Sequence, residues 1–251
     1  MANLTPITAE KLVSGQDKYL LLDVGNTRAK YAVCSNRTLS KIHVVDDKTD
    51  LQQLLSDKKK VLLSAVRREP VIDQINALAA NMGIDVQEVK TEPKTFDLRC
   101  GYEIYPKLGV DRWLSVLALH QQGIDTYAVI DIGTACTCDF VQGNQHLGGW
   151  IAPGYDLMRS SLVSNTHQVT ADTDYPDSLL IGETTESCVN HGCLAYVQGM
   201  LLTAEQKLKS LSDDYRIFID GGSQALLKSI ENKNVQLSPN LVFKGLMRYI
   251  T

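Results

Sequence analysis

The hydrophobic positions of this chain form short apolar runs that alternate with longer amphipathic stretches. Runs rich in β-branched residues predict strands, and stretches with apolar residues every three or four positions predict helices. In the first part of the chain, the predicted strands are 18–24, 29–35, 38–45, 60–66 and 84–89, and the predicted helices are 50–59 and 69–83. Residues 91–108 contain two prolines, show neither pattern and are predicted to be irregular.

The same order of elements then begins again. The predicted strands of the second part are 126–132, 135–142, 145–152, 216–220 and 235–237, and the predicted helices are 109–123, 154–163, 185–211, 223–230 and 241–250. Three strands followed by helix, strand, helix and strand thus occur twice, and the second copy has an inserted long helix and a helical tail. A repeated order of this kind indicates an internal duplication. We expect an α/β fold with two mixed sheets, divided into halves at 1–108 and 109–251.

The first strand of each copy ends in an aspartate followed by a glycine loop, in "DVGNT" from Asp23 and in "DIGTA" from Asp131. Because glycine has no Cβ, backbone amides there can approach a ligand closely, and amides beside a threonine hydroxyl suit phosphate oxygens. A neighbouring carboxylate suits a magnesium ion that arrives with a nucleotide. One such loop is common in ordinary turns, whereas two at matched positions predict a polyphosphate held from both sides of a cleft.

A third glycine element, Gly221-Gly222, follows the strand predicted at 216–220. Residues at such a junction can lie against a base or ribose, or can form only a plain turn between strand and helix. The pattern alone leaves both interpretations open.

Composition narrows the class of protein. With 251 residues, 44% hydrophobic and 22% charged, the chain has the make-up of an ordinary globular protein. A net charge of −4 argues against nucleic acid as a partner. The N-terminus lacks a signal-peptide pattern, and no apolar run approaches the roughly 18 residues of a membrane span. The six cysteines have no CxxC spacing and are expected to be small buried residues in a reducing cytoplasm.

Taken in order, six segments resemble one family. They are "DVGNTRAK", "LGVDRW", "DIGTACTCD", "GGWIAPGYDLM", "IGETTESCVNHG" and "DGGSQALL". Together, from residue 20 to about 230, they resemble the type III pantothenate kinases, which belong to the superfamily of acetate and sugar kinases, heat-shock ATPases and actin. The resemblance implies a duplicated ribonuclease H-like, actin-like ATPase fold whose halves flank a nucleotide cleft. Two segments depart from the family, namely an N-terminal extension of about twenty residues and residues 164–181.

The resemblance also implies a reaction in the cytoplasm, in which ATP with Mg²⁺ phosphorylates pantothenate to 4'-phosphopantothenate, the first step of coenzyme A biosynthesis. It further implies a homodimer whose active site lies at the interface. The implied ATP-binding residues are Asp23, Val24, Gly25, Asn26, Thr27, Arg28, Ala29, Lys30 and Thr134. The implied substrate-binding residues are Tyr102, Gly109, Val110, Asp111, Arg112 and Thr185, of which Thr185 comes from the neighbouring subunit. Asp131 resembles the ligand of a potassium or ammonium ion.

Asp111 and Arg112 at the start of a predicted helix have two interpretations. Asp111 can simply cap the first turn while Arg112 stays solvated. Alternatively, Asp111 accepts the proton of the primary hydroxyl of pantothenate, and Arg112 pairs with its carboxylate in a planar fork. The transition state of phosphoryl transfer is loose, so we expect Asp111 to orient the hydroxyl and to take the proton late. Lys30 is either a ligand or a solvated strand residue, and the histidines, including His146, show no metal-ligand spacing.

Two rival functions remain. One is a kinase of the same superfamily that acts on a sugar or another carboxylate, which the "LGVDRW" segment beside Tyr102 disfavours. The other is a nucleotide-binding regulator without turnover, which would have lost Asp111 or one of the two phosphate loops. Release of ADP with and without pantothenate distinguishes these possibilities.

Overall fold

The computed structural model describes residues 17–166, 170 and 174–250. Residues 1–16, which form most of the N-terminal extension, lie outside the described residues, as do 167–169 and 171–173 of the divergent segment 164–181. In the part of the chain that is described, no helix is both long and apolar enough to cross a membrane.

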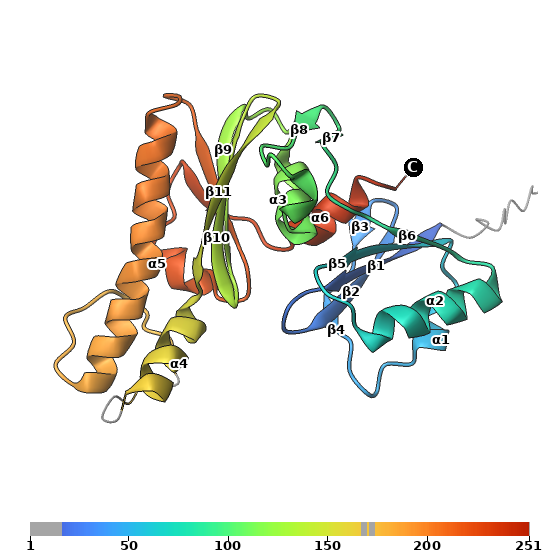
Figure 1. The fold of residues 1–251 in the computed structure, drawn as a ribbon, viewed down its shortest axis with the longest axis horizontal. Helices are drawn as coiled ribbons and strands as arrows, with labels where there is room; N and C mark the ends of the chain where they lie inside the picture. Colours follow the sequence, from blue (N-terminus) through green and yellow to red (C-terminus); the bar gives the residue numbers. More distant parts are fainter. Residues whose placement is uncertain (1–16, 167–169, 171–173, 251) are drawn as a thin grey trace, which may run out of the picture.

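The first half of the chain builds one mixed sheet. Its strands are β1 (Lys18–Val24), β2 (Ala29–Ser35), β3 (Thr38–Leu39), β4 (His43–Val44), β5 (Lys60–Ala65) and β6 (Asp85–Glu88). The order is β3-β2-β1-β5-β6, with β4 also paired to β2. Strand β1 runs antiparallel to β2 and parallel to β5. Helices α1 (Leu51–Leu55) and α2 (Pro70–Met82) cover one face of this sheet (Figure 1).

The second sheet repeats this arrangement. It contains β7 (Lys94–Thr95), β8 (Leu98–Arg99), β9 (Thr126–Ile132), β10 (Ala135–Gln142), β11 (Gln145–Pro153), β12 (Arg216–Asp220) and β13 (Val235–Leu237). Within it, the order β11-β10-β9-β12-β13 matches β3-β2-β1-β5-β6 strand for strand. Strand β9 is antiparallel to β10 and parallel to β12, as β1 is to β2 and β5. The predicted duplicated ribonuclease H-like fold with two mixed sheets is therefore confirmed.

The sheets and helices form successive layers. Helix α5 (Thr185–Lys209) covers the outer face of the second sheet, with α4 (Tyr155–Asn165) beside its N-terminal part (Figure 1). Helices α3 (Val110–Leu119) and α6 (Leu241–Met247) lie between the two sheets. Because successive strand residues point to opposite faces, Leu20 and Leu22 pack towards α2, whereas Tyr19 and Leu21 pack towards α3 and α6.

Two segments cross between the halves of the chain. The hairpin β7–β8 pairs with the second sheet through β11, although it precedes residue 109. Helix α6, near the C-terminus, places Phe243 and Leu246 against Tyr19 and Leu21 of the first sheet. The division at residues 108 and 109 stays a prediction, and these two contacts tie the halves together.

Several local predictions were wrong. The single strand predicted at 38–45 is two short strands, β3 and β4, whose register on β2 differs by one residue. Between them, the Ser40 hydroxyl accepts the N–H of Val33 at 2.9 Å and interrupts the hydrogen-bond ladder between the strands.

The helix predicted at 50–59 ends at Leu55, because the N–H of Lys59 already donates to the carbonyl oxygen of Lys18 in β1. The segment Gln224–Ile230 is a 3₁₀ helix, and 91–108 contains the hairpin β7–β8 and a 3₁₀ turn at Tyr105–Lys107.

Candidate active site

The two glycine loops meet at one place. The hydroxyl oxygens of Thr27 and Thr134 are 2.7 Å apart and share a hydrogen bond. Each loop is closed by its own glycine, since Gly25 N–H donates to Arg28 O at 3.1 Å and Gly133 N–H donates to Ala135 O at 3.0 Å. Both glycine amides are thus used inside the turns, and the threonine hydroxyls are the groups that the loops present to each other.

A cavity of about 430 Å³ opens beside these loops and is lined by both halves of the chain. Its volume is within the usual range of small-molecule sites. Six of the predicted site residues line it, namely Asn26, Gly109, Asp111, Arg112, Asp131 and Thr134.

Three predicted carboxylates lie near one another at this site, and burial perturbs each of them. The pKa of Asp23 is raised to about 6, mainly by burial; the Ser64 hydroxyl lowers this pKa, and the charge of Asp111 raises it. The pKa of Asp131 is raised to about 7, mainly by burial and in addition by the charges of Asp220 and Asp111. Lys30, opposite Asp23 in the sheet register, lowers both pKa values. The site therefore holds more negative charge than it neutralises, which favours a bound cation.

The protein does not supply a complete metal cage here. Among residues 17–166, 170 and 174–250, no three His, Cys, Asp or Glu side chains are grouped closely enough to hold a metal ion. A cation beside Asp23 or Asp131 would take its other ligands from phosphate oxygens and water, which is common for Mg²⁺ in nucleotide sites.

Asp111 lies in the first turn of α3 and faces the cavity. Its Oδ1 accepts the N–H of Arg112 at 2.8 Å, so the carboxylate does contact the first turn. Burial raises the pKa of Asp111, and this amide opposes the rise. A Cβ on Gly109 would lie 2.5 Å from Asp111 Oδ1, so glycine is needed there for the carboxylate to take this position. The capping contact and access to the cavity therefore coexist.

Arg112 is not solvated, because only 8% of its surface is exposed. Its Nε and NH2 groups donate to Asp139 at 2.8 and 2.6 Å in a planar fork. Its NH1 group donates to the Tyr102 hydroxyl at 2.9 Å, and the guanidinium lies 5.7 Å from the centre of the Tyr102 ring. The fork that was expected to meet the substrate carboxylate is thus directed at Asp139, and the NH1 edge remains beside Tyr102.

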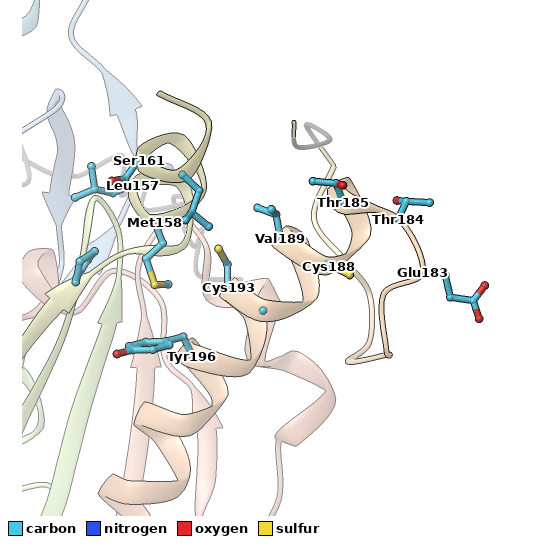
Figure 2. A pocket seen from close by; sticks show the side chains of 13 residues that line it. Leu157, Met158, Ser161, Glu183, Thr184, Thr185, Cys188, Val189, Cys193 and Tyr196 are labelled. Carbon is cyan, nitrogen blue, oxygen red and sulfur yellow. The ribbon is translucent and has the colours of Figure 1, made fainter. Parts of the chain in front are cut away.

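The remaining predicted residues have varied surroundings. Val24 and Val110 are buried in apolar clusters, so they can contribute only backbone atoms to a ligand. Ala29 lies opposite Val24 in the sheet register. Thr185 is the first residue of α5 and lines a different cavity of about 1020 Å³ between α4 and α5 (Figure 2). Among the described residues, Asp111 does not line this cavity, and Thr185 does not line the cavity of about 430 Å³.

Three further residues of the site were missed in the sequence. Asp220 ends β12 in register with Asp131, and its carboxylate accepts the N–H groups of Asn240 and Leu241 at the start of α6. The segment "IFIDGG" repeats the pattern of a strand ending in aspartate and glycine, which was the available signal. Asp139 and His146 are buried, and only the presence of a charge inside an apolar strand pointed to Asp139.

The matched sheets, the touching glycine loops and the acidic cavity between the halves define a protein of the actin-like ATPase fold. Comparison with known proteins resolves this class further. The sequence model of the family described as Type III pantothenate kinase matches residues 19–205. The chain therefore belongs to the type III pantothenate kinase family.

Individual relatives agree with this assignment. The chain is 39% identical over 244 residues to the type III pantothenate kinase of Pseudoalteromonas atlantica, covering 95% of this chain and 99% of that one. It is 33% identical over 242 residues to that of Acinetobacter baylyi, covering 93% and 98%. A crystal structure of a conserved Baf family protein from Campylobacter jejuni matches with a TM-score of 0.60 at 20% identity, covering 92% and 96% of the two chains, which shows a shared fold.

Proposed function

We propose that this chain transfers the γ-phosphoryl group of ATP to the primary hydroxyl of pantothenate and so forms 4'-phosphopantothenate, the first step of coenzyme A biosynthesis. The observation that best supports this function is that Asp111 and Arg112 line the same cavity as Asp131, near the end of β9, and Thr134 of the second glycine loop. An acceptor hydroxyl at Asp111 would thus lie close to a phosphate chain held at the loops. Family membership supports pantothenate as the acceptor.

The nucleotide would lie with its phosphates between the two loops. Binding would replace the Thr27–Thr134 hydrogen bond with hydrogen bonds from both hydroxyls to phosphate oxygens. Mg²⁺ beside Asp23 would neutralise phosphate charge, and a potassium or ammonium ion would lie beside Asp131. The raised pKa values of Asp23 and Asp131 fit both positions, because cations relieve the repulsion between buried carboxylates.

In this proposal Asp111 is the general base. Its carboxylate orients the hydroxyl of pantothenate and accepts its proton as the new O–P bond forms. Burial raises its pKa, which makes it a better base than a solvated aspartate. Most of the rate acceleration would still come from positioning and charge neutralisation, because the transition state is loose.

The active site would be shared across a homodimer. The groove between α4 and α5 that contains Thr185 is lined by Leu157, Leu162 and Tyr196, which are 45%, 43% and 69% exposed. In Figure 2 the Tyr196 and Met158 side chains extend from the two helices into this groove. A second copy of the chain would cover these apolar side chains and bring its Thr185 to the pantothenate held at Asp111. The six free cysteines fit a cytoplasmic location.

The direct test is a coupled assay of ADP release with and without pantothenate. The proposal expects release that depends on pantothenate, together with a phosphorylated product. Release with a sugar instead would indicate the rival kinase function. Nucleotide binding without turnover on any acceptor would indicate a regulator.

The shared site has its own test, in which Asp111→Asn chains are combined with Thr185→Val chains by co-expression. In a heterodimer, one site collects both defects and the other is intact. Random mixing should therefore restore about a quarter of wild-type activity, because half of the dimers are mixed and each has one intact site. Each mutant alone is the control. No recovery in purified heterodimers would show that each site is built within one chain.

A further inference from the structure

We propose that Asp139 and His146 are positioning residues that hold Arg112 and Tyr102 in place for the carboxylate of the acceptor. The inference rests on the proposed function, since it concerns how the same site distinguishes an acid from a neutral acceptor. Neither residue lies at a phosphate loop, and both are buried, with 2% and 0% of their surfaces exposed.

Asp139 is the centre of a closed set of hydrogen bonds. Its two oxygens accept Nε and NH2 of Arg112, and Oδ1 also lies 3.0 Å from His146 Nε2. The His146 Nδ1 accepts the N–H of Gly101 at 3.3 Å, so the ring proton lies on Nε2 and is donated to Asp139. The orientation of the guanidinium is thereby fixed by the backbone at Gly101 as well as by Asp139.

His146 also holds Tyr102, the second residue that faces the acceptor carboxylate in this proposal. Its ring stacks on Tyr102, with centroids 6.2 Å apart and an interplanar angle of 17°. Tyr102 accepts NH1 of Arg112, and its own phenol hydrogen remains to be donated. One buried ring therefore positions both the arginine, through Asp139, and the tyrosine, through stacking.

The sheet leaves space for this arrangement. Gly149 lies opposite Asp139 in the pairing of β11 with β10. A Cβ on Gly149 would lie 3.0 Å from NH2 of Arg112 and 2.0 Å from Cys138 O. Arg112 can reach Asp139 across the strand only because this position has no side chain.

A buried ion pair alone does not show such a role, because breaking one destabilises any protein. The evidence for a positioning role is that Arg112 lines the cavity, while its Nε and NH2 groups are directed away from the cavity towards Asp139. The Asp139 fork uses Nε–H and one N–H of NH2, and Tyr102 takes one N–H of NH1. One N–H each on NH1 and NH2 is left to donate to a carboxylate that Tyr102 also contacts. Asp139 prevents the guanidinium from rotating away from that contact.

The test compares pantothenate with panthenol, the analogue in which a CH₂OH group replaces the carboxylate and the acceptor hydroxyl is kept. The variants are Asp139→Asn, His146→Leu and His146→Gln, whose amide nitrogen can take the place of Nε2. For Asp139→Asn and His146→Leu we expect KM for pantothenate to rise about 10- to 100-fold, as when other orienting partners are lost. The kcat with saturating pantothenate and the kinetics with panthenol should change little, and His146→Gln should recover the part of the wild-type KM that depends on the hydrogen bond to Asp139.

A purely structural role predicts a different result. Lower stability would reduce activity with both acceptors in parallel and leave the preference for pantothenate over panthenol unchanged, which would overturn the inference. His146→Leu leaves the Arg112–Asp139 ion pair intact, so it decides the matter if Asp139→Asn does not fold. Absence of pantothenate-dependent ADP release in the wild type would contradict the proposed function, which is a separate outcome.

Discussion

Asp23 and Asp131 occupy the same position in the two halves of this fold, yet their surroundings differ. Each lies near the end of a central strand, before a glycine loop, and each faces the neighbouring parallel strand in register. Opposite Asp23 that strand supplies Ser64, whose hydroxyl donates to Asp23 at 3.1 Å. Opposite Asp131 it supplies Asp220, a second carboxylate. The pKa is raised to about 6 for Asp23 and to about 7 for Asp131.

This difference shows that the two halves share the same backbone arrangement but place different side chains beside the matched aspartates. A hydroxyl donor stabilises the charged form of Asp23, whereas a neighbouring carboxylate destabilises the charged form of Asp131. The second loop is thus the position with the greater need for a cation, although the raised pKa of Asp23 shows that the first loop also favours one. Asp111 lies on α3, outside both loops, which supports its proposed role at the acceptor instead of the nucleotide.

The largest expected effect separates Asp111 from the loop carboxylates. Asp111→Asn keeps the shape of the side chain but removes the base, so kcat should fall by about 10²- to 10⁴-fold while ATP still binds. Steady-state kinetics and nucleotide titration measure the two quantities. Near-normal turnover would remove Asp111 from the role of base.

Much of this comparison could be read from the sequence. The segments "DVGNT" and "DIGTA" revealed the duplication, since a strand that ends in aspartate and glycine is a local pattern. The ranges of β1, β2, β9, β10, β12 and β13 follow directly from their apolar runs. The predicted cavity residues Asp111, Asp131 and Thr134 do line one cavity, because the order of the repeated strands determines where they lie.

The rest could not be read because it depends on contacts distant in sequence. Ser64 and Asp220 act on Asp23 and Asp131 only through strand pairing, which no local pattern shows. His146 has no metal-ligand spacing, and its proposed role depends on contacts with Asp139 and Gly101. The hairpin β7–β8 was missed since each strand has two residues, too few for any periodicity.

A second prediction uses the two loops as controls for each other. Asp131→Asn should abolish activation by potassium or ammonium, so the rate in potassium becomes similar to that in sodium or Tris. Asp23→Asn should weaken the affinity for Mg²⁺–ATP and keep the ratio between potassium and sodium rates. The expectation for Asp131→Asn follows from the greater excess of negative charge at Asp131. The expectation for Asp23→Asn follows from the proposed position of Mg²⁺ beside Asp23. The two variants are measured at saturating pantothenate in each salt, and equal cation ratios in both would refute the assignment of the cation to the second loop.

The smallest expected effect is on stability and depends on pH. An aspartate in the unfolded chain has a pKa near 3.9, whereas the folded values are about 7 for Asp131 and about 6 for Asp23. Between these values the folded state binds more protons than the unfolded state, so the free energy of unfolding falls as pH rises. Asp131→Asn removes the part of this fall in the free energy of unfolding that comes from Asp131. Without nucleotide and in low potassium, it should raise Tm by several degrees at pH 8, at about 2–4 °C per kcal/mol for a chain of this size.

The pH profile distinguishes this effect from a general change in packing. The gain of Asp131→Asn should vanish near pH 4, grow up to about pH 7 and then level off, because above that value Asp131 is charged in both states of the wild type. Asp23→Asn should show a smaller gain that levels off about one pH unit earlier, at its own folded pKa of about 6. Thermal melts of both variants from pH 4 to pH 8 measure these curves. A constant difference from wild type at every pH, or identical curves for the two variants, would show that the two loops do not differ in charge as their partners Ser64 and Asp220 imply.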